Sequence, residues 1–252
     1  MSRNFELLNQ MGKTPVMMPA EAEPHTPASE PVQDTSAFVA PLEIDGMARE
    51  EFTKLVHRLF LLTSNQAPRR VVFTGTEPGN GTSWVIARVG EILASQVNRS
   101  VCIVDCSLKT PSLHQEFGVE NHHGLSDALR GDGPVRHYAR QLRKNLWLVS
   151  CGASSENAHA LLTSDRMRMR IAELSNEFDY VLMDVAALNT SNDGVVLGNL
   201  ADGVALVLKA NASRRDSTRD LIQLLQASNV RVLGAVLNQR TFPIPERIYS
   251  RL

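Results

Sequence analysis

The chain has 252 residues, of which 43% are hydrophobic and 21% are charged, and its formal net charge is −1. This length suits one sizeable α/β domain with a short appendage. The near-neutral charge gives no electrostatic reason to expect nucleic acid as a partner. No apolar run approaches the roughly 20 residues of a membrane-spanning helix, and the N-terminus lacks a signal-peptide core. We therefore expect a cytoplasmic protein without a direct membrane span.

The first 46 residues are predicted to stand apart from the rest. Residues 14–45 are rich in proline, alanine, glutamate and threonine, so they offer too little apolar surface to offset the entropy of ordering, and we expect a disordered linker. Ahead of it, residues 5–11 could form one short amphipathic helix or a frayed terminus. A folded domain is predicted from residue 47 to residue 252.

Within this domain, short apolar segments alternate with longer segments of helical period. The three cysteines include no CxxC pair and are expected to be buried thiols. The predicted strands are 70–74, 101–105, 146–150, 180–184, 203–209 and 232–237. The predicted helices are 50–62, 83–96, 125–129, 165–178 and 214–228, the last with a capping box of Ser213 and Asp216. Continuous apolar strands separated by helices indicate a doubly wound, mostly parallel sheet covered on both faces. Ligands of such sheets bind at the carboxyl ends of the strands.

The first predicted strand leads into a phosphate-binding loop without its lysine. A working loop follows the pattern GxxxxGK(S/T): backbone N–H groups hold the phosphates, the lysine neutralises them, and the hydroxyl binds Mg²⁺. Here Gly79, Asn80, Gly81 and Ser83 are compatible with the pattern, but Thr82 stands at the lysine position. The pattern predicts a P-loop NTPase fold and leaves its activity in doubt.

Two aspartates end neighbouring apolar segments. Asp105 follows Val101–Val104, and Asp184 follows Tyr180–Met183 as in a Walker B strand. Mg²⁺ prefers hard oxygen ligands, so Ser83, Asp105 and Asp184 are candidate metal ligands. The alternative is that the two aspartates are only helix caps or hydrogen-bond acceptors at strand ends.

These motifs resemble those of the bacterial tyrosine kinases of capsule and exopolysaccharide synthesis, a branch of the MinD and ParA type of P-loop ATPases. The resemblance runs from about residue 50 to residue 252. It implies ATP and Mg²⁺ as cofactors, Asn238 near the adenine, and a membrane polysaccharide co-polymerase or another exopolysaccharide synthesis protein as the partner at the inner face of the membrane. The matching segments are residues 77–81, 105–111, 124–129, 161–167 and 200–204, with His114, Phe117 and Gly118.

The departures from the family pattern fall on its chemistry. Besides Thr82, Ser107 replaces the second aspartate of the DxDxRxP motif, and Thr53 and Val56 replace two arginines of an ExxRxxR helix that assembles subunits into rings. The C-terminal tyrosine cluster, the family's autophosphorylation target, is reduced to Tyr249. Phosphoryl transfer depends on positioning and charge stabilisation, so we expect weak or lost ATP and Mg²⁺ binding and negligible turnover.

Three functions remain as hypotheses. The preferred one is a catalytically degenerate regulator of exopolysaccharide synthesis. The second is an active ATP-dependent tyrosine autokinase, in which Asp105 and Asp184 keep catalytic roles and Lys109, Arg214 or Arg215 supplies the missing cation. The third is a MinD or ParA type positioning ATPase, against which the DxDxRxP-like segment counts. Three arginines at the start of a predicted helix, Arg166, Arg168 and Arg170, are expected to form a solvated face.

Overall fold

The structure, a computed structural model, describes residues 39–61, 67–153 and 157–239. The helix expected over residues 5–11, most of the proline-rich linker and Tyr249 lie outside these ranges. No helix in the described part is long and apolar enough to cross a bilayer.

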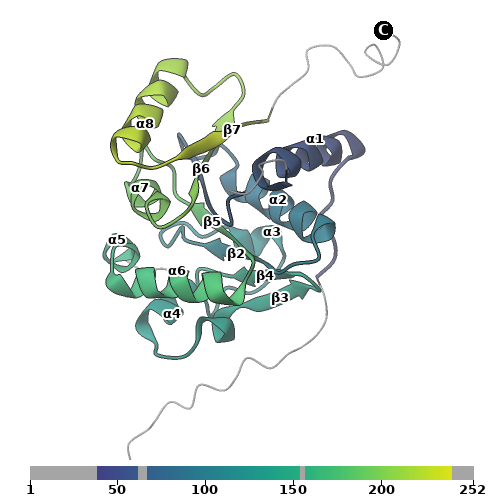
Figure 1. Cartoon of the computed structure of the whole chain (residues 1–252), viewed down its shortest axis with the longest axis vertical. Coiled ribbons are helices and arrows are strands. Elements are labelled where there is room, and N and C mark those ends of the chain that lie inside the picture. Colours follow the sequence, from purple (N-terminus) through teal and green to yellow (C-terminus); the bar gives the residue numbers. More distant parts are fainter. Residues whose placement is uncertain (1–38, 62–66, 154–156, 240–252) are drawn as a thin grey trace, which may run out of the picture. The chain divides into compact units, whose positions relative to one another are not determined.

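The described residues form a mostly parallel sheet of seven strands in the order β3-β4-β2-β5-β1-β6-β7, with helices on both faces (Figure 1). The antiparallel edge strand β3 was not predicted, since its four residues lack a continuous apolar pattern. The strands are β1 (Arg70–Gly75), β2 (Val101–Asp105), β3 (Arg140–Arg143), β4 (Leu146–Val149), β5 (Tyr180–Val185), β6 (Gly203–Lys209) and β7 (Val232–Asn238). This order confirms the predicted fold class.

The helices agree with the predicted ones within a few residues, except at α1, which begins four residues earlier and continues into the π-helical turn η1. Short elements too brief for a periodic signal, α3, α5, α7 and the 3-10 turn η2, were not predicted. The helical elements are α1 (Gly46–Val56), η1 (His57–Leu61), α2 (Thr82–Gln96), α3 (Leu113–Glu116), α4 (Leu125–Arg130), η2 (Val135–Tyr138), α5 (Ala158–Leu162), α6 (Asp165–Glu177), α7 (Asp193–Gly198) and α8 (Arg215–Ala227).

Alternating strand residues divide the interior into two apolar cores. In β1, Val71 and Phe73 pack into the core beneath α1 and α2, while Val72 packs into the core beneath the helices of the opposite face. The period of two follows from the pleat of the strand. Cys102, Cys106 and Cys151 are buried free thiols, as predicted.

Packed backbone begins ahead of the expected boundary at residue 47. Val39 N–H donates to the carbonyl of Leu142 in β3 at 3.2 Å, and Leu42 N–H donates to the Glu91 carboxylate of α2. Arg143 binds both Glu91, at 2.5 Å, and the carbonyl of Ala40. Tertiary contacts with distant residues therefore hold residues 39–45. The proline and charge content of this segment did not predict such packing.

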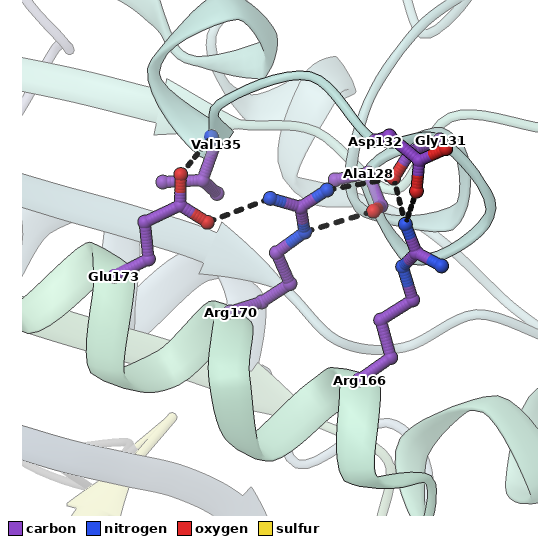
Figure 2. A network of polar contacts seen from close by, with 7 residues as sticks. All are labelled: Ala128, Gly131, Asp132, Val135, Arg166, Arg170 and Glu173. Carbon is purple, nitrogen blue, oxygen red and sulfur yellow. Dashed lines mark hydrogen bonds and ion pairs between the residues drawn. The ribbon is translucent and has the colours of Figure 1, made fainter.

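Two of the three arginines at the start of α6 do not form a solvated face. Arg170 is buried and donates to the carbonyls of Ala128 and Gly131 at the end of α4, while its guanidinium also binds Glu173 at 2.6 Å (Figure 2). Arg166 contacts Gly131 and Asp132 from the preceding turn of α6. The carbonyls at a helix end lack donors within the helix, so the guanidinium groups of these two arginines serve as their hydrogen-bond donors. Only Arg168 remains as predicted, largely exposed to solvent.

The predicted capping box of α8 is also wrong. The N-cap residue is Arg214, without a side-chain cap bond. The Ser213 hydroxyl instead accepts from Lys209 N–H at 3.0 Å and lies 3.4 Å from the Thr76 hydroxyl. Ser213 thus joins the start of α8 to the loop that follows β1, a contact that local sequence does not reveal.

Candidate functional site

The loop between β1 and α2 has the backbone of a phosphate-binding loop. Gly79 and Gly81 have φ values of 81° and 78°, in the left-handed region that favours glycine. A Cβ on Gly81 would also lie 2.4 Å from the amide nitrogen of Asn238, so this position requires glycine for two reasons. The first backbone bond of α2 runs from Val85 N–H to Gly81, which leaves the earlier N–H groups of the helix free to bind an anion.

Two asparagines hold this loop against the sheet. The Asn80 amide donates to the Thr76 hydroxyl at 3.0 Å and to the carbonyl of Val207 in β6 at 2.9 Å. The Asn238 amide, at the end of β7, donates to the carbonyl of Asn80 at 2.9 Å. Asn238, expected near an adenine, therefore positions the loop itself, while its place beside a base remains a prediction.

No cation takes the place of the missing lysine in the described part of the chain. Thr82 is the first residue of α2, and its hydroxyl lies 3.1 Å from where a Cβ on Gly75 would be, so it faces the beginning of the loop. Lys109, Arg214 and Arg215 are exposed, and none of them forms a hydrogen bond or ion pair with the loop. Among the described residues, the backbone dipoles of the loop and of the start of α2 are the groups that would meet a phosphate at this loop.

The two predicted aspartates meet at the carboxyl edge of the sheet. Asp105 and Asp184 are register partners in the adjacent strands β2 and β5, and both are fully or nearly fully buried. The Ser83 hydroxyl donates to Asp184 Oδ2 at 2.5 Å, which brings the loop and the Walker B strand together. The sequence-predicted set of Ser83, Asp105 and Asp184 is thus a cluster in space.

Asp105 also acts as a cap. Its Oδ1 accepts from Ser107 N–H at 3.0 Å, and its Oδ2 accepts from Ser112 and Leu113 N–H at 3.2 Å each. These bonds hold the segment that starts α3. Asp184 has no such role, because its carboxylate binds the Ser83 side chain rather than helix N–H groups.

Burial dominates the electrostatics of the pair. It raises the pKa of Asp105 to about 6, although three backbone N–H groups oppose the shift. The pKa of Asp184 is raised well above its usual value, first by burial and then by the charge of Asp105, while the Ser83 hydrogen bond opposes the shift. Two buried carboxyls side by side favour a shared proton or a cation between them.

Ser112 is a site residue that the sequence did not single out. Its hydroxyl donates to the Ser83 hydroxyl at 2.6 Å. Ser112 is the N-cap residue of α3, but its side chain makes no cap bond and is thus available to the site. The sequence signal that could have identified this residue is a serine seven residues after Asp105 and directly before Leu113.

The oxygen ligands present fit Mg²⁺ in part. Ser83 and Asp184 offer two hard oxygens, and Asp105 a third at the same edge. Among the described residues, no three His, Cys, Asp or Glu side chains form a metal-binding group, so a bound ion would depend on waters and phosphate oxygens. Ser107, at the position of the family's second aspartate, bonds Thr110 instead.

Trp84 packs beside the loop. Its ring is 5.5 Å from Phe52 of α1, and the Arg88 guanidinium lies 4.2 Å from the ring centroid. Arg88 in turn binds Glu116 at 2.6 Å. The Trp84 ring of α2 is therefore held between Phe52 of α1 and Arg88 of its own helix, and it is partly buried against the core beneath α1 and α2.

The strand, loop and helix around Gly79–Ser83, with the aspartate pair at the sheet edge, define a P-loop NTPase fold of the MinD and ParA type. The family model described as "Cellulose biosynthesis protein BcsQ" matches residues 69–218, and the chain belongs to this family.

Sequence relatives are named as tyrosine-protein kinases. The chain is 32% identical over 169 residues to the putative tyrosine-protein kinase EpsB of Ralstonia nicotianae, a match that covers 67% of this chain and 22% of EpsB. It is 24% identical over 201 residues to the tyrosine-protein kinase YwqD of Bacillus subtilis, covering 79% of this chain and 84% of YwqD. The chain thus spans less than a quarter of EpsB but most of YwqD.

A solved structure supports the fold. The kinase domain of the Escherichia coli tyrosine kinase ETK superposes with a TM-score of 0.75 at 23% identity, over 84% of this chain and 86% of that domain. The resemblance to bacterial tyrosine kinases and to the MinD and ParA branch, expected from the motifs, is confirmed.

Proposed function

We propose that this chain is a catalytically degenerate relative of the tyrosine autokinases, acting in exopolysaccharide or capsule synthesis as a regulatory partner of a membrane polysaccharide co-polymerase. The observation that carries this proposal is the phosphate loop: its glycines and Ser83 are in place, but Thr82 is uncharged and no other described cation contacts the loop.

The site's remaining groups support weak nucleotide binding. The N–H groups of residues 79–83 would hold phosphate oxygens, and Ser83 with Asp184 would hold Mg²⁺. When bound, ATP would supply the phosphoryl group, and Mg²⁺ would neutralise part of the phosphate charge. The chain itself positions these ligands through Asn80 and Asn238.

The lost groups are those that stabilise charge in the transition state. Removing one electrostatic stabiliser of this kind costs on the order of 3 kcal/mol, a factor of about a hundred in rate. Thr82 and Ser107 account for two such losses, since the Ser107 hydroxyl bonds Thr110. The combined effect supports a binding role rather than turnover.

The partner and location follow from the proposal. A fold kept intact without its phosphoryl-transfer groups is best explained by a retained binding surface. We infer that the co-polymerase recruits the chain to the inner face of the cell membrane.

An active autokinase is the second candidate, and one contact favours it. The Thr76 and Ser213 hydroxyls lie 3.4 Å apart, which places the start of α8, with Arg214 and Arg215, next to the loop. In this candidate, either guanidinium would turn toward a bound phosphate through a change of side-chain rotamer. Tyr249 would accept the transferred phosphoryl group. A positioning ATPase of the MinD or ParA type is the third candidate, supported by the fold alone.

Complementation tests these candidates. We expect the chain to co-purify with a membrane co-polymerase, and a polysaccharide defect on gene deletion to be rescued equally by wild type and by Asp184→Ala. Failure of Asp184→Ala at normal abundance and with a native circular dichroism spectrum would favour the autokinase. A partition or division defect with normal polysaccharide would favour the third candidate.

A further inference from the structure

A groove of about 1020 Å³ lies between α1 and β7, on the side of α2 that carries Trp84. Its apolar lining includes Phe52, Leu55, Trp84 and Val236. Met47 and Leu237 also line it, and their side chains are 51% and 57% exposed. Large apolar side chains this exposed, gathered in one concave surface, indicate a surface that another segment covers.

The charges around the groove balance. Asp45 and Glu51 oppose Lys54 and Arg58 among its lining residues, and Lys54 is already paired with Glu50 and Glu51 at 2.9 Å. A strongly anionic or cationic partner would find no net complementary charge there. The groove therefore favours an apolar peptide segment.

The chain's own C-terminal segment begins at this groove. Gln239, the last described residue of the chain, lines the groove, and its φ of 55° turns the backbone at the end of β7. Residues 240–252 follow directly. The described N-terminal residue Val39, by contrast, bonds Leu142 of β3, the strand at the opposite edge of the sheet from β7.

The apolar residues near the start of the C-terminal segment suit the groove. Phe242 and Ile244 each precede a proline, which favours an extended backbone, and residues two apart in an extended chain face the same side. Thirteen extended residues reach about 43 Å, whereas the eleven residues of α1 span about 16 Å. The segment is therefore long enough to follow the whole groove.

We propose that residues 240–252 bind in the groove between α1 and β7 of the same chain, with Phe242 and Ile244 against Phe52, Leu55 and Trp84. Because Asn238 lines the groove and also holds the phosphate loop through Asn80, the bound segment lies beside the candidate nucleotide site. This inference does not depend on whether ATP is bound.

Crosslinking of the full chain tests the proposal. Met47→Cys with Ile244→Cys places one thiol at the groove and one in the segment, while the three native cysteines are buried. A short bismaleimide should form an intrachain link at least about tenfold faster than in the control pair Leu224→Cys with Ile244→Cys, because docking raises the effective concentration. Leu224 is a comparably exposed residue on α8, at 43%.

Other outcomes contradict the proposal. Equal intrachain rates for the two pairs would show that the segment does not dock. Interchain dimers that form with the Met47 pair, in proportion to concentration, would assign the groove to a second copy.

Fluorescence gives an independent measurement. In a Trp147→Phe background, Trp84 is the sole tryptophan of the chain. Replacing Phe242 and Ile244 by serine in the full chain should shift Trp84 emission to the red and increase its quenching by acrylamide. Unchanged emission and quenching would overturn the proposal.

Discussion

Thr82 stands where the phosphate-loop pattern has its lysine, so residues 76–83 carry no positive side chain. We predict that Thr82→Lys strengthens binding of ATP with Mg²⁺ about tenfold or more, equivalent to at least about 1.4 kcal/mol. Isothermal titration measures this, with Thr82→Ala as the uncharged control. Tighter binding need not bring turnover with it, since Ser107 is unchanged. Micromolar affinity in the wild type, or equal affinity of the lysine and alanine variants, would contradict this account.

Asp184 carries a second prediction at the residue scale. Burial raises its pKa above the unfolded value, so the folded state binds this proton more tightly, and the stability that it contributes is lost as pH rises through the folded pKa. The variant Asp184→Asn stays neutral. Its free energy of unfolding relative to wild type should therefore increase from pH 5 to pH 8, by about 1.4 kcal/mol for each pH unit that lies between the unfolded and the folded pKa of Asp184.

Urea denaturation at the two pH values measures this difference. Asp216→Asn is the matched control, because the Asp216 side chain is 93% exposed. A difference between Asp184→Asn and wild type that does not change with pH would show that the carboxyl titrates normally.

At the scale of elements, the contact between α4 and α6 depends on one buried guanidinium. Arg170 donates hydrogen bonds to the carbonyls of Ala128 and Gly131, and its guanidinium also binds Glu173 (Figure 2). We predict that Arg170→Met lowers the free energy of unfolding by about 2–3 kcal/mol, since buried acceptors lose their donors. Arg168→Met, on the exposed face of the same helix, should change it by less than about 0.5 kcal/mol. Equal effects of the two changes in urea denaturation would refute the capping role.

At the scale of the whole molecule, α1 lacks the groups expected to bind neighbouring subunits in a ring. Thr53 is uncharged and Val56 is fully buried, so neither arginine position presents a cation, and the intervening Lys54 is engaged by Glu50 and Glu51. We predict monomers or small oligomers in light scattering at high protein concentration. Thr53→Arg gives a comparison variant at the more accessible position. A stable species of octamer size in the wild type would contradict the prediction.

Much of the fold followed from local patterns. Buried strands such as β2 and β6 have continuous apolar sequences, and their bounds were predicted without error. The edge strand β3 and the short helices α3, α5 and α7 escaped prediction because four to six residues carry too little periodicity, and tertiary contacts hold them.

The sequence by itself determined the fold class, the phosphate loop and the absence of its lysine, because residue identities and spacing along one segment suffice for these. Only the tertiary structure decided which distant groups meet. Ser112 reaches Ser83, Ser213 lies by Thr76, and Arg170 is buried at the end of α4. These contacts depend on how strands and helices far apart in the chain pack together, and the same burial sets the raised pKa values of the two aspartates.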